Sequence, residues 1–68
     1  MEKFTLRTAR DRAGLNLKDA AEMLGVNKDT LANYESGTTY PKAPEILKML
    51  EIYDVKFEQL IFLRQEHA

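Results

Sequence analysis

The sequence predicts a small all-α domain of five short helices. Glycine and proline divide the chain into short segments, at Gly14, Gly25, Gly37 and the Pro41–Pro44 stretch. Each segment carries apolar residues at the three- and four-residue spacing of a helix face, and none alternates apolar and polar residues as a half-buried strand does. Because 68 residues give room for one such domain, residues 1–68 are expected to form a single unit.

The first two helices are predicted on either side of Gly14. Leu6, Ala9 and Ala13 share one face of the first helix, which ends at that glycine. Asn16 is placed to cap the start of the second helix, and Gly25 follows its end, where a left-handed residue is commonly needed. The apolar face of this second helix consists of Leu17, Ala20, Ala21 and Leu24.

Three further helices are predicted after Gly25. Asn27 can cap the third helix, which turns Leu31 and Tyr34 inward and stops near Gly37. The fourth helix has Pro44 in its first turn. Its apolar stripe consists of Ile46, Met49, Leu50 and Tyr53. A short fifth helix is predicted from the helical spacing of Phe57, Leu60 and Ile61.

The composition excludes several classes of protein. The chain has no cysteine for disulfides or thiolate metal sites, and its one histidine, His67, cannot build a metal cluster alone. No apolar run approaches the ~20 residues of a membrane helix and the first residues lack a signal-peptide layout, which predicts a soluble, cytoplasmic protein. Without a nucleophile–base pair, paired carboxylates or a glycine-rich phosphate loop, we expect no enzyme, no cofactor and no metal.

The net charge gives little support to nucleic-acid binding by itself. It is -1, with an isoelectric point of about 5.7, whereas such domains are often basic. The charges are unevenly distributed, since residues 1–18 carry five basic and two acidic side chains. A basic surface would therefore combine the first helix with Lys18, Lys28 and Lys42.

The residues around Gly25 have the spacing of a helix-turn-helix. Two helices can cross steeply at a tight turn only if the side chains at the crossing are small, and Ala21 lies four residues before Gly25. Val26 can close the turn from below, and Leu31, six residues after Gly25, returns to the core. This layout predicts a helix-turn-helix made by the second and third helices.

One arc of the third helix carries short side chains opposite Leu31. The arc consists of Lys28, Asp29, Ala32, Asn33 and Ser36. Such an arc suits a helix that lies in the major groove of DNA and contacts base edges. Any surface helix is polar outside, but that alternative does not explain why this face lacks runs of long Glu and Lys. Together with the turn, the arc favours binding to double-stranded DNA.

Residues 6–61 resemble the phage-repressor and Cro-type helix-turn-helix family (the xenobiotic-response-element type) in its short single-domain form. The matching segments are 6–10, 14–16, 20–27 and 30–37, followed by Pro41 and the pattern Ile46, Val55, Leu60. The resemblance implies a five-helix, lambda-repressor-like domain whose third helix is the recognition helix, with 62–68 as a tail or dimer contact. It also implies a prokaryotic or phage transcriptional regulator, by preference a repressor, that associates with the nucleoid when bound.

The resemblance places Lys28, Asp29, Ala32 and Asn33 at the family's base-contacting positions. Lys28 can donate to guanine, Asn33 can bridge adenine N6 and N7, and Ala32 can meet a thymine methyl group. Asp29 can accept from cytosine N4, or it can instead complement the positive end of the helix dipole. Both roles are compatible with the sequence.

Phosphate contacts are expected at the starts of the second and third helices, where backbone N–H groups and the helix dipole favour anions. Asn16, Lys18 and Asn27 stand there. The loop at residues 38–42 resembles the one that runs beside the DNA backbone in the family, which implies contacts by Thr39 and Lys42. An ordinary polar connection is the alternative for this loop.

Arg10 and Glu35 match a pair that the family joins by a structural salt bridge between the first and third helices. Arg10 lies on the apolar side of its helix with Leu6 and Ala13, where an unpaired guanidinium would be costly. Glu35 flanks the inward arc of the third helix and is its candidate partner.

Three residues depart from the family pattern. Leu17 stands where the family usually has a glutamine that touches DNA and braces the recognition helix, and here it extends an apolar stripe. Lys56 stands where a serine usually caps the fifth helix, and Asp54 replaces a common glycine.

The C-terminal end predicts a homodimer. Residues 60–63 are four consecutive apolar residues, which one short helix cannot bury, so Phe62 and Leu63 either cap the core or meet a partner. With Val55 and Phe57 they can form a two-fold interface that places two recognition helices about 34 Å apart on successive major grooves. We favour the dimer and a palindromic operator, because a single small module rarely reaches useful specific affinity.

A protein-interaction module with the same fold, such as an antitoxin-like regulator, is the rival function. The net charge, Leu17 and Asp29 favour it slightly. Lys28, Asn33 and the loop at 38–42 favour DNA binding instead.

Overall fold

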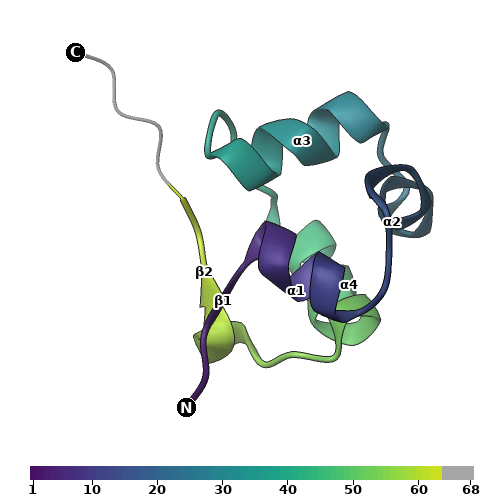
Figure 1. The fold of residues 1–68 in the computed structure, drawn as a ribbon. Coiled ribbons are helices and arrows are strands. Elements are labelled where there is room, and N and C mark those ends of the chain that lie inside the picture. The colour runs from purple at the N-terminus through teal and green to yellow at the C-terminus, as the bar shows by residue number, and fades with distance from the viewer. Residues whose placement is uncertain (64–68) are drawn as a thin grey trace.

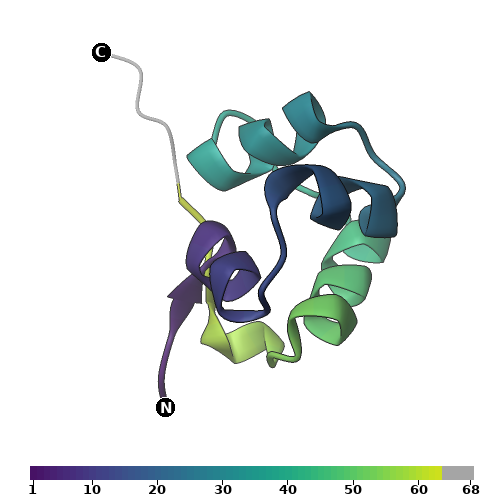
Figure 2. The ribbon, with the colours of Figure 1, turned by 45° about the vertical axis from the view of Figure 1, so that its right-hand side comes forward.

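The chain folds into four α-helices and one short pair of parallel strands within residues 1–63, the part that the computed structural model describes (Figure 1). In chain order the elements are β1 (Phe4–Thr5), α1 (Leu6–Arg12), α2 (Leu17–Leu24), α3 (Lys28–Ser36), α4 (Ala43–Tyr53), a 3-10 turn (Phe57–Gln59) and β2 (Leu60–Ile61). Helix α2 lies between α3 and α4 (Figure 2), and α1 packs on both α3 and α4. No helix in this part is long and apolar enough to span a membrane. His67 and most of the expected tail at 62–68 lie outside the described residues.

Side-chain caps start the first three helices. Asn16, expected as a cap, accepts a hydrogen bond at its Oδ1 from the backbone N–H of Asp19 at 2.8 Å. Asn27 accepts from the N–H of Thr30 in the same way at 2.7 Å. Thr5 caps α1 with a bond of 3.1 Å. Each cap satisfies one of the N–H groups that a helix leaves unpaired at its start, which helps such short helices keep defined ends.

The core is built from side chains of every helix and both strands. Its apolar members are less than a tenth exposed: Phe4, Leu6, Ala9, Ala20, Ala21, Leu24, Leu31, Met49, Tyr53, Val55 and Leu60. Helix α3 contributes a single buried residue to it, Leu31. Tyr34 of the same helix is half-buried against this core, so Leu31 and Tyr34 together form the inner face of α3.

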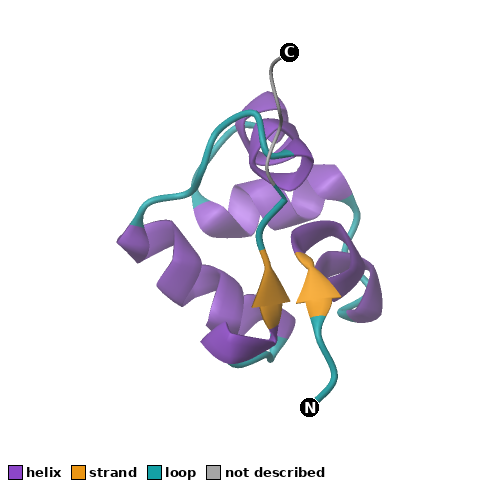
Figure 3. Cartoon of the chain, turned by 90° about the vertical axis from the view of Figure 1, so that its left-hand side faces the viewer, coloured by secondary structure: helices purple, strands orange, loops and turns teal. Residues whose placement is uncertain are grey.

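The chain after α4 does not form the fifth helix expected there, and the expected all-α class gains a strand pair. Phe57–Gln59 is a single 3-10 turn, and β2 pairs in parallel with β1, with Phe4 beside Leu60 (Figure 3). A segment of about five residues is too short to sustain a helix alone, and the pairing with β1 satisfies its backbone instead. The spacing of Phe57 and Leu60 fits a 3-10 turn as well as an α-helix.

Helix α4 ends at Asp54, where the family pattern commonly has glycine. Asp54 adopts φ 54° and ψ 54°, in the left-handed region. Aspartate is among the residues other than glycine that enter this region most readily. The chain therefore turns at this point without a glycine.

Candidate nucleic-acid interface

The corner between α2 and α3 is a glycine turn closed by two backbone hydrogen bonds. Gly25 adopts φ 77°, in the left-handed region that glycine enters without steric cost. Its N–H donates to the carbonyl of Glu22 at 3.1 Å, and the N–H of Val26 donates to that of Ala21 at 3.0 Å. These two bonds form a Schellman motif. The predicted helix-turn-helix is therefore present, with α3 running across the end-on view of α2 in Figure 1.

One side of α3 presents the four residues predicted to contact bases. Lys28, Asp29 and Asn33 are exposed, and Ala32 is half-buried. On the opposite side, Leu31 is fully buried. The four residues thus form an outward row, here named the α3 ridge. Asp29 lies in the first turn of α3, a position compatible with both of the roles expected for it.

The residues predicted to contact phosphates lie at the two helix starts and in the loop after α3. Asn16 and Asn27 use their Oδ1 atoms as caps, so their side-chain NH2 groups are the donors suited to an anion. Lys18 is exposed in the first turn of α2. Thr39 and Lys42 are exposed in the loop, and the N–H of Thr39 donates to an α3 carbonyl at 3.3 Å. This hydrogen bond therefore holds the first part of the loop against the C-terminal end of α3.

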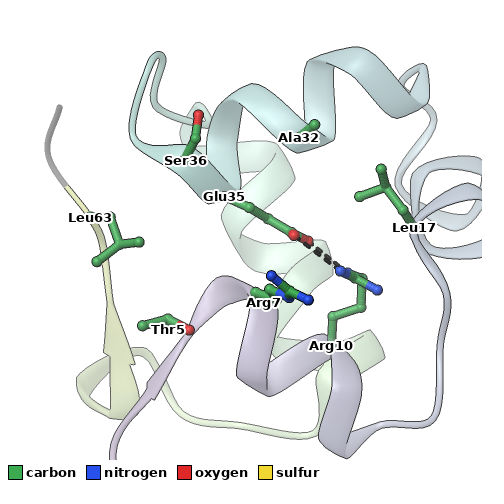
Figure 4. A pocket seen from close by; sticks show the side chains of 8 residues that line it. All are labelled: Thr5, Arg7, Arg10, Leu17, Ala32, Glu35, Ser36 and Leu63. Carbon is green, nitrogen blue, oxygen red and sulfur yellow. Dashed lines mark hydrogen bonds and ion pairs between the residues drawn. The ribbon is translucent and has the colours of Figure 1, made fainter.

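Arg10 and Glu35 form a nearly buried ion pair between α1 and α3 (Figure 4). The Nε of Arg10 donates to Oε2 of Glu35 at 2.7 Å and its Nη2 donates to Oε1 at 3.1 Å, a bidentate arrangement. Its Nη1 donates to the carbonyl of Leu15 at 3.0 Å. Each side chain of the pair is 10% exposed. The hydrogen bond to Glu35 raises the pKa of Arg10 above its already high ordinary value, so the guanidinium stays charged.

Tyr53 is a buried neighbour of this pair. Burial raises the pKa of its hydroxyl to about 12, and the charge of Glu35 acts in the same direction. The hydroxyl has no hydrogen-bond partner within residues 1–63. Because Tyr53 stays neutral near pH 7, it adds no second charge beside Arg10 and Glu35.

A hollow of about 440 Å³ opens beside the α3 ridge (Figure 4). Its lining consists of Thr5, Arg7, Arg10, Leu17, Ala32, Glu35, Ser36 and Leu63. Ala32 belongs to both the hollow and the α3 ridge, so the two surfaces are continuous. The sequence does not indicate that these residues line one hollow, because they come from segments that are far apart along the chain. Ser36 is the exception, since it shares an arc of the helical wheel with Ala32.

The four residues expected at a dimer interface differ in exposure. Val55 is 8% exposed and belongs to the core, so the folded monomer already buries it. Phe57 and Leu63 remain 57% and 43% exposed. Phe62 is half-buried, with its ring centroid 6.0 Å from that of Phe57. Ile61, which was not expected there, is a further exposed apolar residue at this end.

Comparisons with known proteins agree with this geometry. A family model described as helix-turn-helix matches residues 6–60. The chain is 36% identical to the HTH-type transcriptional regulator ImmR of Bacillus subtilis strain 168 over 56 residues, which cover 82% of this chain and 44% of ImmR. It is 38% identical over 56 residues to the cryptic phage CTXphi transcriptional repressor RstR of Vibrio cholerae, covering 82% of this chain and 48% of RstR.

A third relative is a putative HTH-type transcriptional regulatory protein of Archaeoglobus fulgidus. It is 40% identical over 58 residues, which cover 82% of this chain and 19% of that protein. The chain thus spans less than half the length of each of these three relatives. No solved structure matches the chain.

Proposed function

The chain belongs to the helix-turn-helix family of the Cro/C1 type, whose model spans residues 6–60, and on this premise we propose that it regulates transcription by binding double-stranded DNA with sequence specificity. The observation that carries the proposal is the α3 ridge, which stands exposed on a helix that the Gly25 corner sets across α2. In this role the protein is a non-catalytic regulator. It acts in the cytoplasm and associates with the nucleoid when bound. A repressor is the preferred sense, because the relative RstR is named as one.

Helix α3 has suitable dimensions and chemistry for the major groove. An α-helix with its side chains is about 10–12 Å in diameter, which matches the groove width of about 12 Å. Placed there, Lys28 donates to guanine O6 or N7 and Asn33 bridges N6 and N7 of adenine. Asp29 accepts from cytosine N4 or complements the helix dipole, and Ala32 meets a thymine methyl group.

The phosphate contacts fix the register of α3 in the groove. Asn16 and Lys18 at the start of α2 and Asn27 at the start of α3 bind phosphates with side-chain and backbone donors. Thr39 and Lys42 bind from the loop after α3. These contacts do not depend on sequence, so they supply affinity while the α3 ridge supplies specificity.

The regulator acts as a homodimer on a palindromic operator. Phe57 and Leu63 are the expected interface residues that the monomer leaves most exposed, and Phe62 supports them through its contact with Phe57. Val55 contributes only as part of the core behind that surface. A two-fold arrangement makes the half-site spacing about one helical turn.

Selection from a pool of random duplexes, read at two salt concentrations, tests the proposed function. We expect one palindromic sequence to be enriched, with an affinity that falls as salt rises. Absence of enrichment at either salt concentration would contradict the proposed function. Enrichment of a single asymmetric half-site would retain DNA binding and contradict the dimer.

Substitution of Lys28 or Asn33 by alanine is expected to weaken binding to the selected operator by about 1–3 kcal/mol and to relax one base position. Each variant removes the donor groups for one base pair and leaves the core untouched, since both side chains are exposed. Binding isotherms on the operator and on its single-base variants measure both effects. Lys48→Ala, an exposed lysine on α4, is the control and should bind as the parent does. Equal affinity of all three variants would contradict the assignment of the α3 ridge.

Lys42→Ala is expected to weaken all duplexes alike and to flatten the salt dependence of binding by about one unit of slope. A phosphate contact carries no sequence information, so the preference among operators should remain. Affinities measured on operator and scrambled duplexes over a salt series test this. Lys56→Ala, an exposed lysine beyond α4, should leave the slope unchanged. A Lys42→Ala protein with the parental slope would remove Lys42 from the interface.

A further inference from the structure

Leu17 occupies an unusual place for an apolar side chain. It is the first residue of α2, beside the Asn16 cap and next to the expected phosphate contacts. The other apolar residues on its stripe, Ala20, Ala21 and Leu24, are no more than 2% exposed. Leu17 is only half-buried, packing partly against the core and partly lining the hollow. Its apolar surface is thus presented where the proposed interface calls for contacts to DNA.

Leu17 and Ala32 are the two apolar side chains that line the ridge end of the hollow. Figure 4 shows both of them at the end that lies between α2 and α3, with Thr5 and Leu63 at the other end. Ala32 extends this apolar lining onto the α3 ridge, which is the surface proposed to meet base edges. A base edge that the ridge brings to this point therefore meets methyl groups first.

The buried Arg10–Glu35 pair in the hollow does not change this chemistry, and the exposed Arg7 of the same lining has its Nε 3.9 Å from a carboxylate oxygen of Asp11. Both carboxylate oxygens of Glu35 accept hydrogen bonds from Arg10, and the remaining Arg10 nitrogen donates to the carbonyl of Leu15. These groups already have hydrogen-bond partners, so they do not replace the hydrogen bonds to water that a base edge loses when it enters the hollow. A base with a donor or acceptor at this point would lose hydrogen bonds to water without replacement, at a cost in affinity.

We propose that Leu17, with Ala32, forms a pocket for the 5-methyl group of a thymine and so selects a thymine at one position of each half-site. Thymine is the base that places a methyl group in the major groove. Burial of one methyl group improves affinity by about fourfold. This inference rests on the proposed function and deepens it by assigning a specificity residue to α2, outside the recognition helix.

Replacement of single thymines by 2′-deoxyuridine tests the pocket, because it removes the methyl group and leaves base pairing unchanged. The probe is the duplex enriched from the random pool, with each thymine replaced in turn. For the parent protein we expect one position in each half-site at which uracil weakens binding by about fourfold. For Leu17→Ala we expect that difference to disappear while the other positions keep their preferences.

Two further variants serve as a control and as a second test of the pocket. Met23→Ala shortens an exposed apolar side chain elsewhere on α2 and should retain the parental sensitivity to uracil. Leu17→Gln keeps the side-chain length but removes the apolar side chain, so it should lose that sensitivity as Leu17→Ala does. Helical content measured by circular dichroism confirms that each variant is folded.

The outcomes distinguish this inference from the proposed function. If no duplex is enriched, both are overturned. If a duplex is enriched but the parent protein tolerates uracil at every thymine, or Leu17→Ala keeps the parental sensitivity, the methyl pocket alone is overturned. A parent protein that tolerates uracil at every thymine overturns the pocket without any variant. Because Ala32 can meet a methyl group by itself, the two Leu17 variants assign the sensitivity to Leu17.

Discussion

Replacement of Arg10 by methionine is expected to lower the free energy of unfolding by about 3–5 kcal/mol. The substitution removes two hydrogen bonds to Glu35 and one to the carbonyl of Leu15. It also leaves the Glu35 carboxylate without its cationic partner. Because this side chain is only 10% exposed, water cannot take the place of the guanidinium. A domain of this size has about 3–10 kcal/mol of stability in total. Urea denaturation followed by circular dichroism should therefore find the variant close to unfolding even without urea.

Two variants separate the loss of the pair from the loss of a charge. Arg7→Met removes a guanidinium from the same helix, but that side chain is 74% exposed and 3.9 Å from Asp11, so the expected loss is below ~0.5 kcal/mol. A double variant, Arg10→Met with Glu35→Leu, leaves no unpaired charge and should recover much of the stability. A loss under ~1 kcal/mol for Arg10→Met, or a double variant no more stable than the single one, would contradict this account.

The helix-turn-helix could be predicted because its determinants are local. Asn16, Gly25 and Asn27 act within a few residues of their own positions, as caps and as a left-handed turn. The ridge followed from the same local geometry, since one buried residue, Leu31, orients the whole helical wheel. When the ends of a short helix and its one buried residue are known, the side chains that face outward are largely determined.

The C-terminal end could not be predicted in the same way, because its structure depends on contacts with distant residues. Leu60 is extended because β1, at the other end of the chain, pairs with it. Gln59 supports this arrangement by donating to the carbonyl of Glu2 at 3.2 Å, across 57 positions of sequence. Without knowledge of that partner, the spacing of Phe57 and Leu60 indicates a helix.

The hollow beside the α3 ridge was missed for a related reason. Leu17 and Ala32 belong to different helices, and they line the same hollow only because the corner at Gly25 sets α3 across α2. From the sequence, Leu17 was a departure from a glutamine and an extension of an apolar stripe. The structure adds that this stripe emerges at the proposed DNA surface, which a helical wheel of α2 alone does not show.

Stability and DNA binding are coupled in α3, because the helix must stay packed on α2 and α1 for its outer face to be presented. Leu31 is the one fully buried residue of α3, Tyr34 is half-buried against the core, and Glu35 adds the ion pair to α1. The α3 ridge binds productively only while α3 is docked. The fraction of molecules with α3 docked therefore multiplies the intrinsic affinity for DNA.

Substitution of Leu31 by alanine is expected to lower the free energy of unfolding by about 2–5 kcal/mol and to weaken DNA binding in proportion to the folded fraction. The leucine is fully buried, so truncation leaves a cavity that the small helices around it can only partly fill. Leu31→Met keeps the volume and should cost less than ~1.5 kcal/mol, while Leu47→Ala, at a side chain 65% exposed on α4, should cost below ~0.5 kcal/mol. Urea denaturation and binding isotherms on the same samples compare the two losses. Equal stability of the Leu31→Ala and Leu47→Ala proteins would show that contacts other than Leu31 hold α3 against the core.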